Sequence, residues 1–185
     1  LHGILIVGAQ PLVRQFVILV HALDALEGSG RWKVTLSGEV LARPAVGNGM
    51  VIVRTVDGYL RALDAADGSE FWNVEQQVPR LSLRGNSAPA IVGSAVIAGF
   101  DNGRIAAYDL DDGDIRWENV IAPPSGRTEM DRLADVDSSI VVVGQDVIVN
   151  NVAGLGNGHD DALFIANGDG TFTDVAVGGQ INTKA

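Results

Sequence analysis

Side chains that could carry out acid–base, nucleophilic or metal chemistry are few in this chain of 185 residues. The three histidines, His2, His21 and His159, match no metal-binding spacing. There is no cysteine, which excludes a thiol nucleophile, thiolate metal sites and disulfides within these residues. The Gly-x-Ser-x-Gly, Gly-x-Gly-x-x-Gly and phosphate-loop patterns are also missing. The sequence therefore predicts a protein that is not an enzyme and needs no cofactor.

Carboxylates gather in one segment, residues 126–139, with the sequence GRTEMDRLADVDSS. No histidine and no glycine-rich loop accompanies these carboxylates, so catalysis is less well supported than a role in binding. Such an acidic segment can pair with basic groups of a partner protein and fix its register. A plain surface connection is the alternative interpretation.

A second group of oxygen ligands lies near the C-terminus. The tail, with LFIANGDGTF at 163–172, resembles a propeller repeat of the FG-GAP or VCBS type. That resemblance implies a calcium loop in which Asn157, Gly158 and Asp161 fall in the later part, but the earlier acidic positions hold Ala153 and Leu155. Calcium takes roughly six to eight oxygen ligands, with help from carboxylates. Asn157 and Asp161 therefore stay calcium candidates, and a glycine-rich β-hairpin is the favoured interpretation.

Charge and hydropathy narrow the class of protein. Lysine and arginine number 13 against 23 aspartates and glutamates, a net charge of −10, which argues against nucleic-acid binding. Residues 3–20 are apolar, but Pro11, Arg14 and Gln15 interrupt them before the roughly 20 apolar residues of a membrane-spanning helix are reached. We expect buried strands in this segment; a degraded targeting segment is the alternative.

The elements that must position these groups come from a repeat. The segments ALDALEGSGRW (22–32), ALDAADGSEFW (62–72) and AYDLDDGDIRW (107–117) share Ala, then Asp two residues later, Gly six later and Trp ten later. The chain's three tryptophans, Trp32, Trp72 and Trp117, all occupy this last position. Chance is a poor explanation for that coincidence.

Each repeat reads as a pair of strands around a tight turn. The Asp side chain can cap the turn, and the Gly supplies a positive φ. Asp57-Gly58 and Asn102-Gly103 predict further hairpins upstream. A unit of about 40–45 residues with four short strands has the period of a β-propeller blade. The sequence therefore predicts an all-β propeller, with tryptophans filling the space between blades.

Two connections between these units carry a family resemblance. The tryptophan motif resembles the docking motif of quinoprotein-type propellers, and the segments LSLRGNSAP (81–89) and TEMDRLADVD (128–137) resemble the BamB-type outer-membrane-protein assembly lipoproteins, over about residues 34–149. The resemblance implies a noncatalytic periplasmic scaffold that binds the POTRA region of the BamA-type barrel protein and supports barrel insertion. It places partner contacts at these positions: Leu81, Leu83, Arg84, Asp135 and Asp137. The leucines would be apolar anchors, whereas Arg84 and the aspartates would form charged contacts or hold the loops.

The chain departs from that family's pattern in several ways. The family has eight blades and a lipidated N-terminal cysteine, whereas this sequence predicts about three to four blades and has no cysteine. We expect location at the periplasmic face of the outer membrane, with membrane association only through the partner or through a lipid anchor that this sequence lacks. An open set of blades has unpaired edges, so marginal stability or self-association is expected if the chain is made alone.

The C-terminal segment LFIANGDGTF (163–172) resembles a different propeller repeat, of the FG-GAP or VCBS type. The sequence therefore predicts three parts: an atypical apolar segment (1–20), Trp-docked blades (21–150) and a glycine-rich tail (151–185). Two other functions stay open. One is a quinone-dependent dehydrogenase, although the adjacent cysteines and calcium site typical of that class are not visible. The other is a calcium-dependent adhesion or carbohydrate-binding propeller.

Overall fold

The computed structural model describes these residues of the chain: 10–12, 15–79, 87–121, 134–135, 140–143, 146–150, 152–153, 163–166, 172–174, 176–177 and 180–181. All the regular structure in these ranges is β-strand, and the strands are antiparallel. The all-β prediction is therefore confirmed. Within the described residues there is no helix of the length and apolarity that crossing a bilayer demands.

Three sheets follow one another along the first two thirds of the chain, each a meander in sequence order. The first sheet holds β1 (Gln10–Leu12), β2 (Gln15–Leu23) and β3 (Gly30–Leu36). The second holds β4 (Ala45–Gly47), β5 (Met50–Arg54), β6 (Tyr59–Asp64) and β7 (Glu70–Glu75). The third holds β8 (Ala90–Val92), β9 (Ala95–Gly99), β10 (Arg104–Asp109) and β11 (Ile115–Val120).

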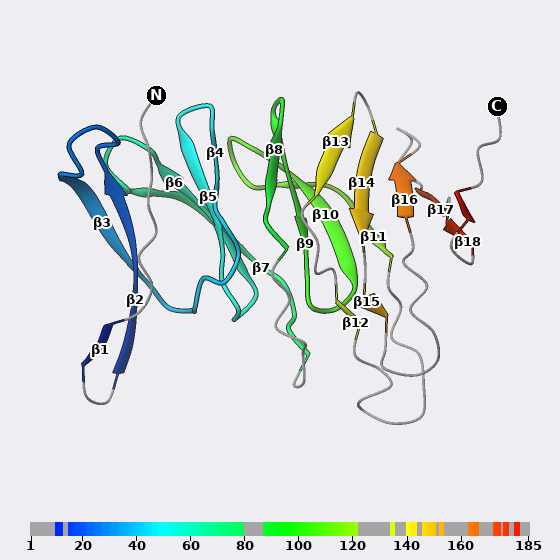
Figure 1. The fold of residues 1–185 in the computed structure, drawn as a ribbon, viewed down its shortest axis with the longest axis horizontal. Helices are drawn as coiled ribbons and strands as arrows, with labels where there is room; N and C mark the ends of the chain where they lie inside the picture. Colours follow the sequence, from blue (N-terminus) through cyan, green and yellow to red (C-terminus); the bar gives the residue numbers. More distant parts are fainter. Residues whose placement is uncertain are drawn as a thin grey trace.

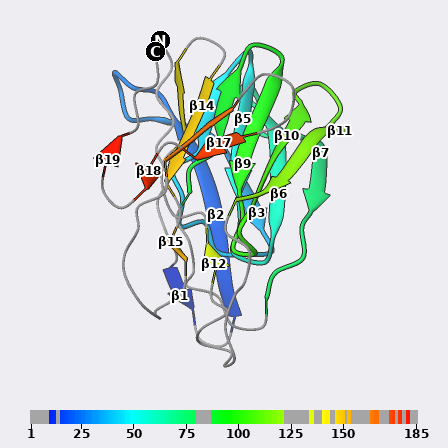
Figure 2. The ribbon, with the colours of Figure 1, turned by 90° about the vertical axis from the view of Figure 1, so that its right-hand side faces the viewer.

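The remaining strands form one larger sheet and two short pairs. The fourth sheet has the order β13 (Val141–Val143), β14 (Asp146–Asn150), β16 (Leu163–Ala166), β17 (Phe172–Asp174). The pairs are β12 (Ala134–Asp135) with β15 (Val152–Ala153), and β18 (Ala176–Val177) with β19 (Gln180–Ile181). Figure 1 shows the sheets standing side by side in chain order, as propeller blades do, and Figure 2 views the stack end-on.

The repeated motif has the same geometry in all three copies. Ala22, Ala62 and Ala107 pair with the tryptophan ten residues later, and the register shifts directly after each alanine. The aspartate two residues on accepts a backbone hydrogen bond from the glycine of its turn. Its carboxylate also accepts one from the backbone N–H two residues after it, and the turn glycines have φ between +66° and +80°. The predicted capping by Asp and positive φ at Gly are confirmed.

The predicted hairpins form as well. Gly58 and Gly103 have positive φ and lie in the turns that join β5 to β6 and β9 to β10. In both turns the glycine N–H donates to a carbonyl three residues earlier, of Thr55 or Phe100, at 3.1 Å. The alternation of strand and turn in the sequence thus gives the blade directly.

Apolar residues fill the spaces between successive sheets. One buried cluster joins the first and second sheets through Val20, Val51 and Leu63. A second joins the second and third sheets and includes Ile52 and Phe100, and a third includes Ile97 and Ile105 of the third sheet with Ile140 and Val147. Burial between sheets, rather than within one sheet, is what stabilises a stack of this kind.

The three predicted parts of the chain stay predictions. Strand β2 runs through residue 20, and its residues Ile18 and Val20 are buried. The fourth sheet takes β14 from one side of residue 150 and β16 from the other. Both predicted boundaries therefore fall where the chain runs within or between paired strands.

Candidate partner-binding surface

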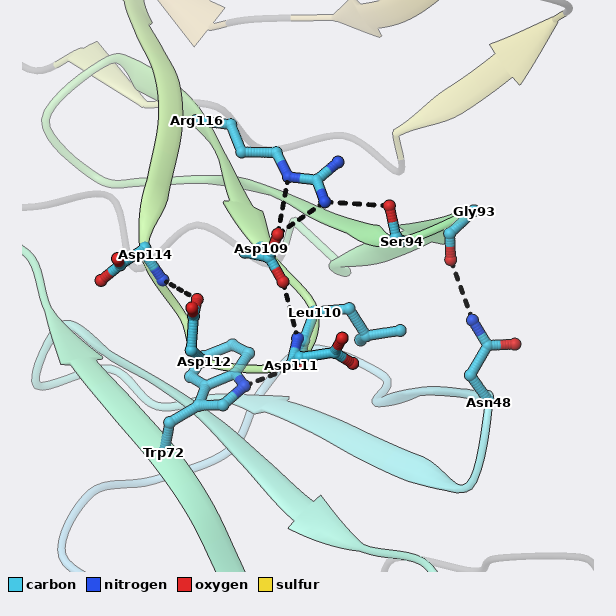
Figure 3. A network of polar contacts seen from close by, with 10 residues as sticks. All are labelled: Asn48, Trp72, Gly93, Ser94, Asp109, Leu110, Asp111, Asp112, Asp114 and Arg116. Carbon is cyan, nitrogen blue, oxygen red and sulfur yellow. Dashed lines mark hydrogen bonds and ion pairs between the residues drawn. The ribbon is translucent and has the colours of Figure 1, made fainter.

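Two tryptophans dock on the sheet that follows their own. The indole Nε1 of Trp32 donates to the carbonyl of Ala65 at 3.0 Å, and that of Trp72 donates to the carbonyl of Leu110 at 2.8 Å. Both acceptors lie three residues after the motif alanine of the next sheet. Figure 3 shows Trp72 against the turn that contains Leu110 and Asp112. Each bond holds one blade in register with the next.

The docked ring lies on the glycine of the next motif. A Cβ atom at Gly68 would come within 2.6 Å of the Trp32 ring, and one at Gly113 within 2.8 Å of the Trp72 ring. Glycine is therefore required twice at this position, for the positive φ and for the ring above it. Trp117 is half-buried and packs on the cluster that contains Ile140 and Val147.

Polar contacts lie across the junction between the second and third sheets and within the third sheet. Asn48 Nδ2 donates to the Gly93 carbonyl across the junction at 2.9 Å (Figure 3). Within the third sheet, Arg116 donates to Asp109 at 2.6 Å and to Ser94 at 2.9 Å. The hydrogen bond from Arg116 lowers the pKa of the Asp109 carboxyl, and the backbone N–H of Asp111 contributes to the same shift.

An ion pair is buried at the same junction. Arg54, at the end of β5, pairs with Asp101 in the turn after β9, and the two residues are only 5% and 4% exposed. The guanidinium carbon of Arg54 also lies 5.6 Å from the centre of the Phe100 ring. A buried ion pair such as this favours one arrangement of the two sheets because either charge alone would be costly.

The two long links that follow the second and third sheets start at the same end of the stack. Gln76 N donates to the Gly58 carbonyl at 3.0 Å, and Ile121 N donates to the Gly103 carbonyl, also at 3.0 Å. The links 76–89 and 121–140 therefore leave beside the β5–β6 and β9–β10 turns. Figure 1 places these turns, together with β12 and β15, at the lower end of the molecule. The motif turns lie at the opposite end of the same strands.

Most of the predicted site residues lie outside the described ranges. These are Leu81, Leu83 and Arg84 in the first link, Asp137 in the second, and the calcium candidates Asn157 and Asp161. Asp135 is described as part of β12, where it pairs with Val152 of β15. Among the residues that the structure describes, no group of three His, Asp or Glu side chains could hold a metal ion.

The ends of both links are described, and they are fixed. Ser87 and Pro89 at the end of the first link are buried, as are Ile121 and Ile140 at the two ends of the second. Sequence reasoning missed the residues that hold the start of the first link, Gln76 and Tyr108. A signal for them was available, because Tyr108 occupies a motif position where the other two copies have leucine.

Comparison with known proteins decides the family. The sequence matches the family described as outer membrane protein assembly factor BamB over residues 6–175. The chain belongs to this family. It is 40% identical to the BamB protein of Yersinia pestis over 155 residues, which are 84% of this chain and 39% of that protein. The resemblance seen in the sequence is thereby confirmed.

Solved structures agree on the fold. The crystal structure of BamB from Moraxella catarrhalis superposes with a TM-score of 0.75 at 30% identity, covering 85% of this chain and 47% of that one. A quinohemoprotein alcohol dehydrogenase from Comamonas testosteroni gives 0.66 at 22% identity, over 93% of this chain and 34% of that one, which shows a shared fold alone. The chain spans less than half the length of these BamB proteins.

Proposed function

We propose that this chain is part of a noncatalytic scaffold for outer-membrane β-barrel assembly, and that its links 76–89 and 121–140 contact a periplasmic partner. The partner is the POTRA region of the BamA-type barrel protein, and the location is the periplasmic face of the outer membrane. Membership of the BamB family is the observation that carries the proposal. The relatives' name, outer membrane protein assembly factor, supports it.

The geometry supports a binding surface at the link end of the stack. Both links start there beside turns that the blades hold in place, and Ser87, Ile121 and Ile140 at their ends are buried. Rigid support lowers the entropy lost when a loop binds a partner. Leu81 and Leu83 would supply apolar anchors, because buried apolar contacts at the centre of an interface carry much of its binding energy.

Charge would have a separate part in the interaction. Asp135 and Asp137 lie in the second link, and Arg84 in the first. Charged groups at the rim of an interface mainly affect the association rate and its salt dependence, whereas apolar anchors mainly affect dissociation. The two links would therefore contribute in ways that kinetics can separate.

The apolar contribution is tested by binding of the purified chain to a soluble POTRA-region fragment. The double variant Leu81→Ala/Leu83→Ala should bind about a hundredfold more weakly, since hot-spot residues typically cost about 2 kcal/mol or more each and are not additive. Leu41→Ala is the matched control, because Leu41 is an exposed leucine of the shorter link 37–44. Circular dichroism must show that all three proteins fold. Absence of binding by the folded parent would refute the proposal.

The charged contribution needs a second pair of variants. Asp135→Asn/Asp137→Asn should slow association by about two- to fivefold at low salt and leave dissociation nearly unchanged. At high salt the variant and the parent should associate at similar rates, because exposed charges are then screened. An effect confined to dissociation would contradict this assignment.

A further inference from the structure

The first residues of the link 76–89 are held by three hydrogen bonds to residues outside the link. Gln76 Nε2 donates to the Tyr108 hydroxyl at 3.0 Å, and Asn102 Nδ2 donates to the Gln77 carbonyl at 3.2 Å. Both partners belong to the third sheet and its turns, whereas the link leaves from the second. The third contact is the bond from Gln76 N to the Gly58 carbonyl within the second sheet. The start of the link is thus joined to two sheets.

Gly58 shows how closely this start is packed. A Cβ atom at Gly58 would collide with the Gln76 carbonyl oxygen and would come within 2.6 Å of Cγ2 of Val78. Gly58 also has φ +93°, so glycine is needed for both reasons. The backbone from Gln76 to Val78 therefore lies directly on the β5–β6 turn.

The pair Gln76 and Tyr108 is a departure from the repeat. One junction earlier, the equivalent positions hold Leu36, four residues after Trp32, and Leu63, directly after the motif alanine. Those two leucines lie in one buried apolar cluster. If stability were the only requirement at this junction, the same apolar pair would be sufficient here. The polar pair that replaces the two leucines lies at the start of the link to which the family resemblance assigns partner contacts.

Tyr108 is suited to fixing the link. It is only 2% exposed, and its ring meets Phe100 edge-on at 6.4 Å between centres. Burial raises the pKa of its phenol, so the hydroxyl stays protonated at neutral pH. A buried hydroxyl without a partner is costly, and Gln76 supplies one. The hydrogen bond therefore selects one position for Gln76.

The shorter link 37–44 is held in a related way. Ser37 Oγ donates to the Asp57 carboxylate at 3.0 Å, and Val56 N donates to the Glu39 carbonyl at 2.8 Å. Asp57 occupies the same turn position as Asn102 in the following sheet. At two successive junctions, then, a turn residue of the next blade fixes the first residues of the link. The second junction adds the side-chain hydrogen bond from Gln76 to the hydroxyl of the buried Tyr108.

We propose that Gln76, Tyr108 and Asn102 are positioning residues, which set the direction in which the link 76–89 leaves the stack and so determine its affinity for the partner. The effect on affinity rests on the proposed function, whereas the effect on the position of the link rests only on the contacts described above. None of the three residues needs to touch the partner. Replacing them should weaken binding although Leu81, Leu83 and Arg84 are unchanged.

The decisive variant restores the apolar pair of the preceding junction, Gln76→Leu/Tyr108→Leu. We expect a melting temperature equal to or above that of the parent, faster amide hydrogen exchange at residues 77–87, and about threefold to tenfold weaker binding to the soluble POTRA-region fragment, since one hydrogen bond contributes about a kcal/mol. A purely structural role would change the melting temperature and not the exchange of the link. Unchanged exchange and affinity in the folded variant would overturn the inference.

Two milder changes guard against misfolding. Tyr108→Phe removes only the hydroxyl. Asn102→Asp replaces the amide donor with a carboxylate oxygen, while an oxygen remains for Arg104 N. Asn48→Asp is the control for the latter, because it removes an equivalent donor to Gly93 at the opposite end with the same change in charge. Tyr108→Phe and Asn102→Asp should speed exchange in the link, and Asn48→Asp should not. If the parent fails to bind, the proposed function fails alone, and exchange still decides the positioning role.

Discussion

The first junction joins the first and second sheets, and the second junction joins the second and third. The same tryptophan contact is present in both, but the other residues packed between the sheets differ. In both, a tryptophan lies on a motif glycine and donates to a carbonyl of the next sheet. Around Trp32 the packed residues are apolar. The second junction also contains the buried ion pair of Arg54 and Asp101 and the hydrogen bond from Gln76 to Tyr108.

The difference separates what the repeat needs from what this chain needs. Tryptophan docking, apolar packing and the exposed contacts of the link 37–44 hold the first two sheets together. Buried polar pairs add geometric selectivity, since each group tolerates only one arrangement of its partner. Of these two junctions, the second is therefore the one whose geometry is more closely specified, and the link 76–89 leaves from it.

The largest expected effect comes from removing the indoles. Trp72 is 7% exposed, so Trp72→Ala should lower the free energy of unfolding by about 3–5 kcal/mol. Trp32 is only half-buried, and Trp32→Ala should cost about 2 kcal/mol. Urea unfolding followed by circular dichroism measures both. A larger loss for Trp32→Ala would reverse the ranking of the two junctions.

The buried ion pair gives the next largest effect. Asp101→Ala leaves the Arg54 guanidinium buried without this carboxylate and should cost about 3 kcal/mol. The double variant Arg54→Met/Asp101→Leu should recover most of that loss, because neither charge is then buried. Thermal unfolding of the two variants beside the parent makes the comparison. A double variant no more stable than Asp101→Ala would show that the pair is not what fixes this junction.

The motif glycines give a matched pair of smaller effects. Gly68→Ala places a Cβ atom on a residue with positive φ and against the Trp32 ring. It should lower the free energy of unfolding by about 2 kcal/mol or more. Gly28 has φ +66° with open space around its Cβ position, so Gly28→Ala should cost only about 1 kcal/mol. Equal losses in urea unfolding would mean that the ring contact adds nothing to the backbone term.

The smallest effect is a pH dependence at Asp109. The pKa of the Asp109 carboxyl is lowered in the fold, mainly by the hydrogen bond from Arg116. The stabilisation from this contact is therefore fully present above the ordinary carboxylate pKa of about 4, and it is lost as the pH falls through the lowered pKa. Melting temperatures between pH 6 and pH 2.5 should therefore fall less for Asp109→Asn than for the parent. Asp111→Asn, with the same change in net charge, should follow the parent. Parallel curves for parent and Asp109→Asn would contradict the assignment.

The sequence predicts the local parts of this fold well. Asp64 and Gly68 predict their turn because capping and positive φ depend only on residues close together in the sequence. The period of the tryptophans predicts blades, and the second and third sheets have four strands each. The surface on which each ring docks was not predictable, because the partner of Trp72 lies 38 residues away.

The polar pairs were missed for the same reason. Arg54 ends a strand and has the pattern of an exposed residue, yet it is buried because Asp101 lies against it, 47 residues along the chain. Gln76 similarly has the pattern of an ordinary link residue. Tyr108 alone carried a visible sign, as the one copy of its motif position that is not leucine. Comparing repeats within a chain is thus a way to find residues that the repeat itself does not need.

Hydrogen exchange of the chain with and without the soluble POTRA-region fragment tests the central claim most directly, because it compares the two ends of the stack in one measurement. Our account predicts that binding protects amides of residues 77–87 and 134–139, at the link end. Amides of the motif turns 24–28, 64–68 and 109–113, at the opposite end, should exchange as they do in the free chain. Protection confined to the motif turns, or no protection at a saturating concentration of the fragment, would contradict the account.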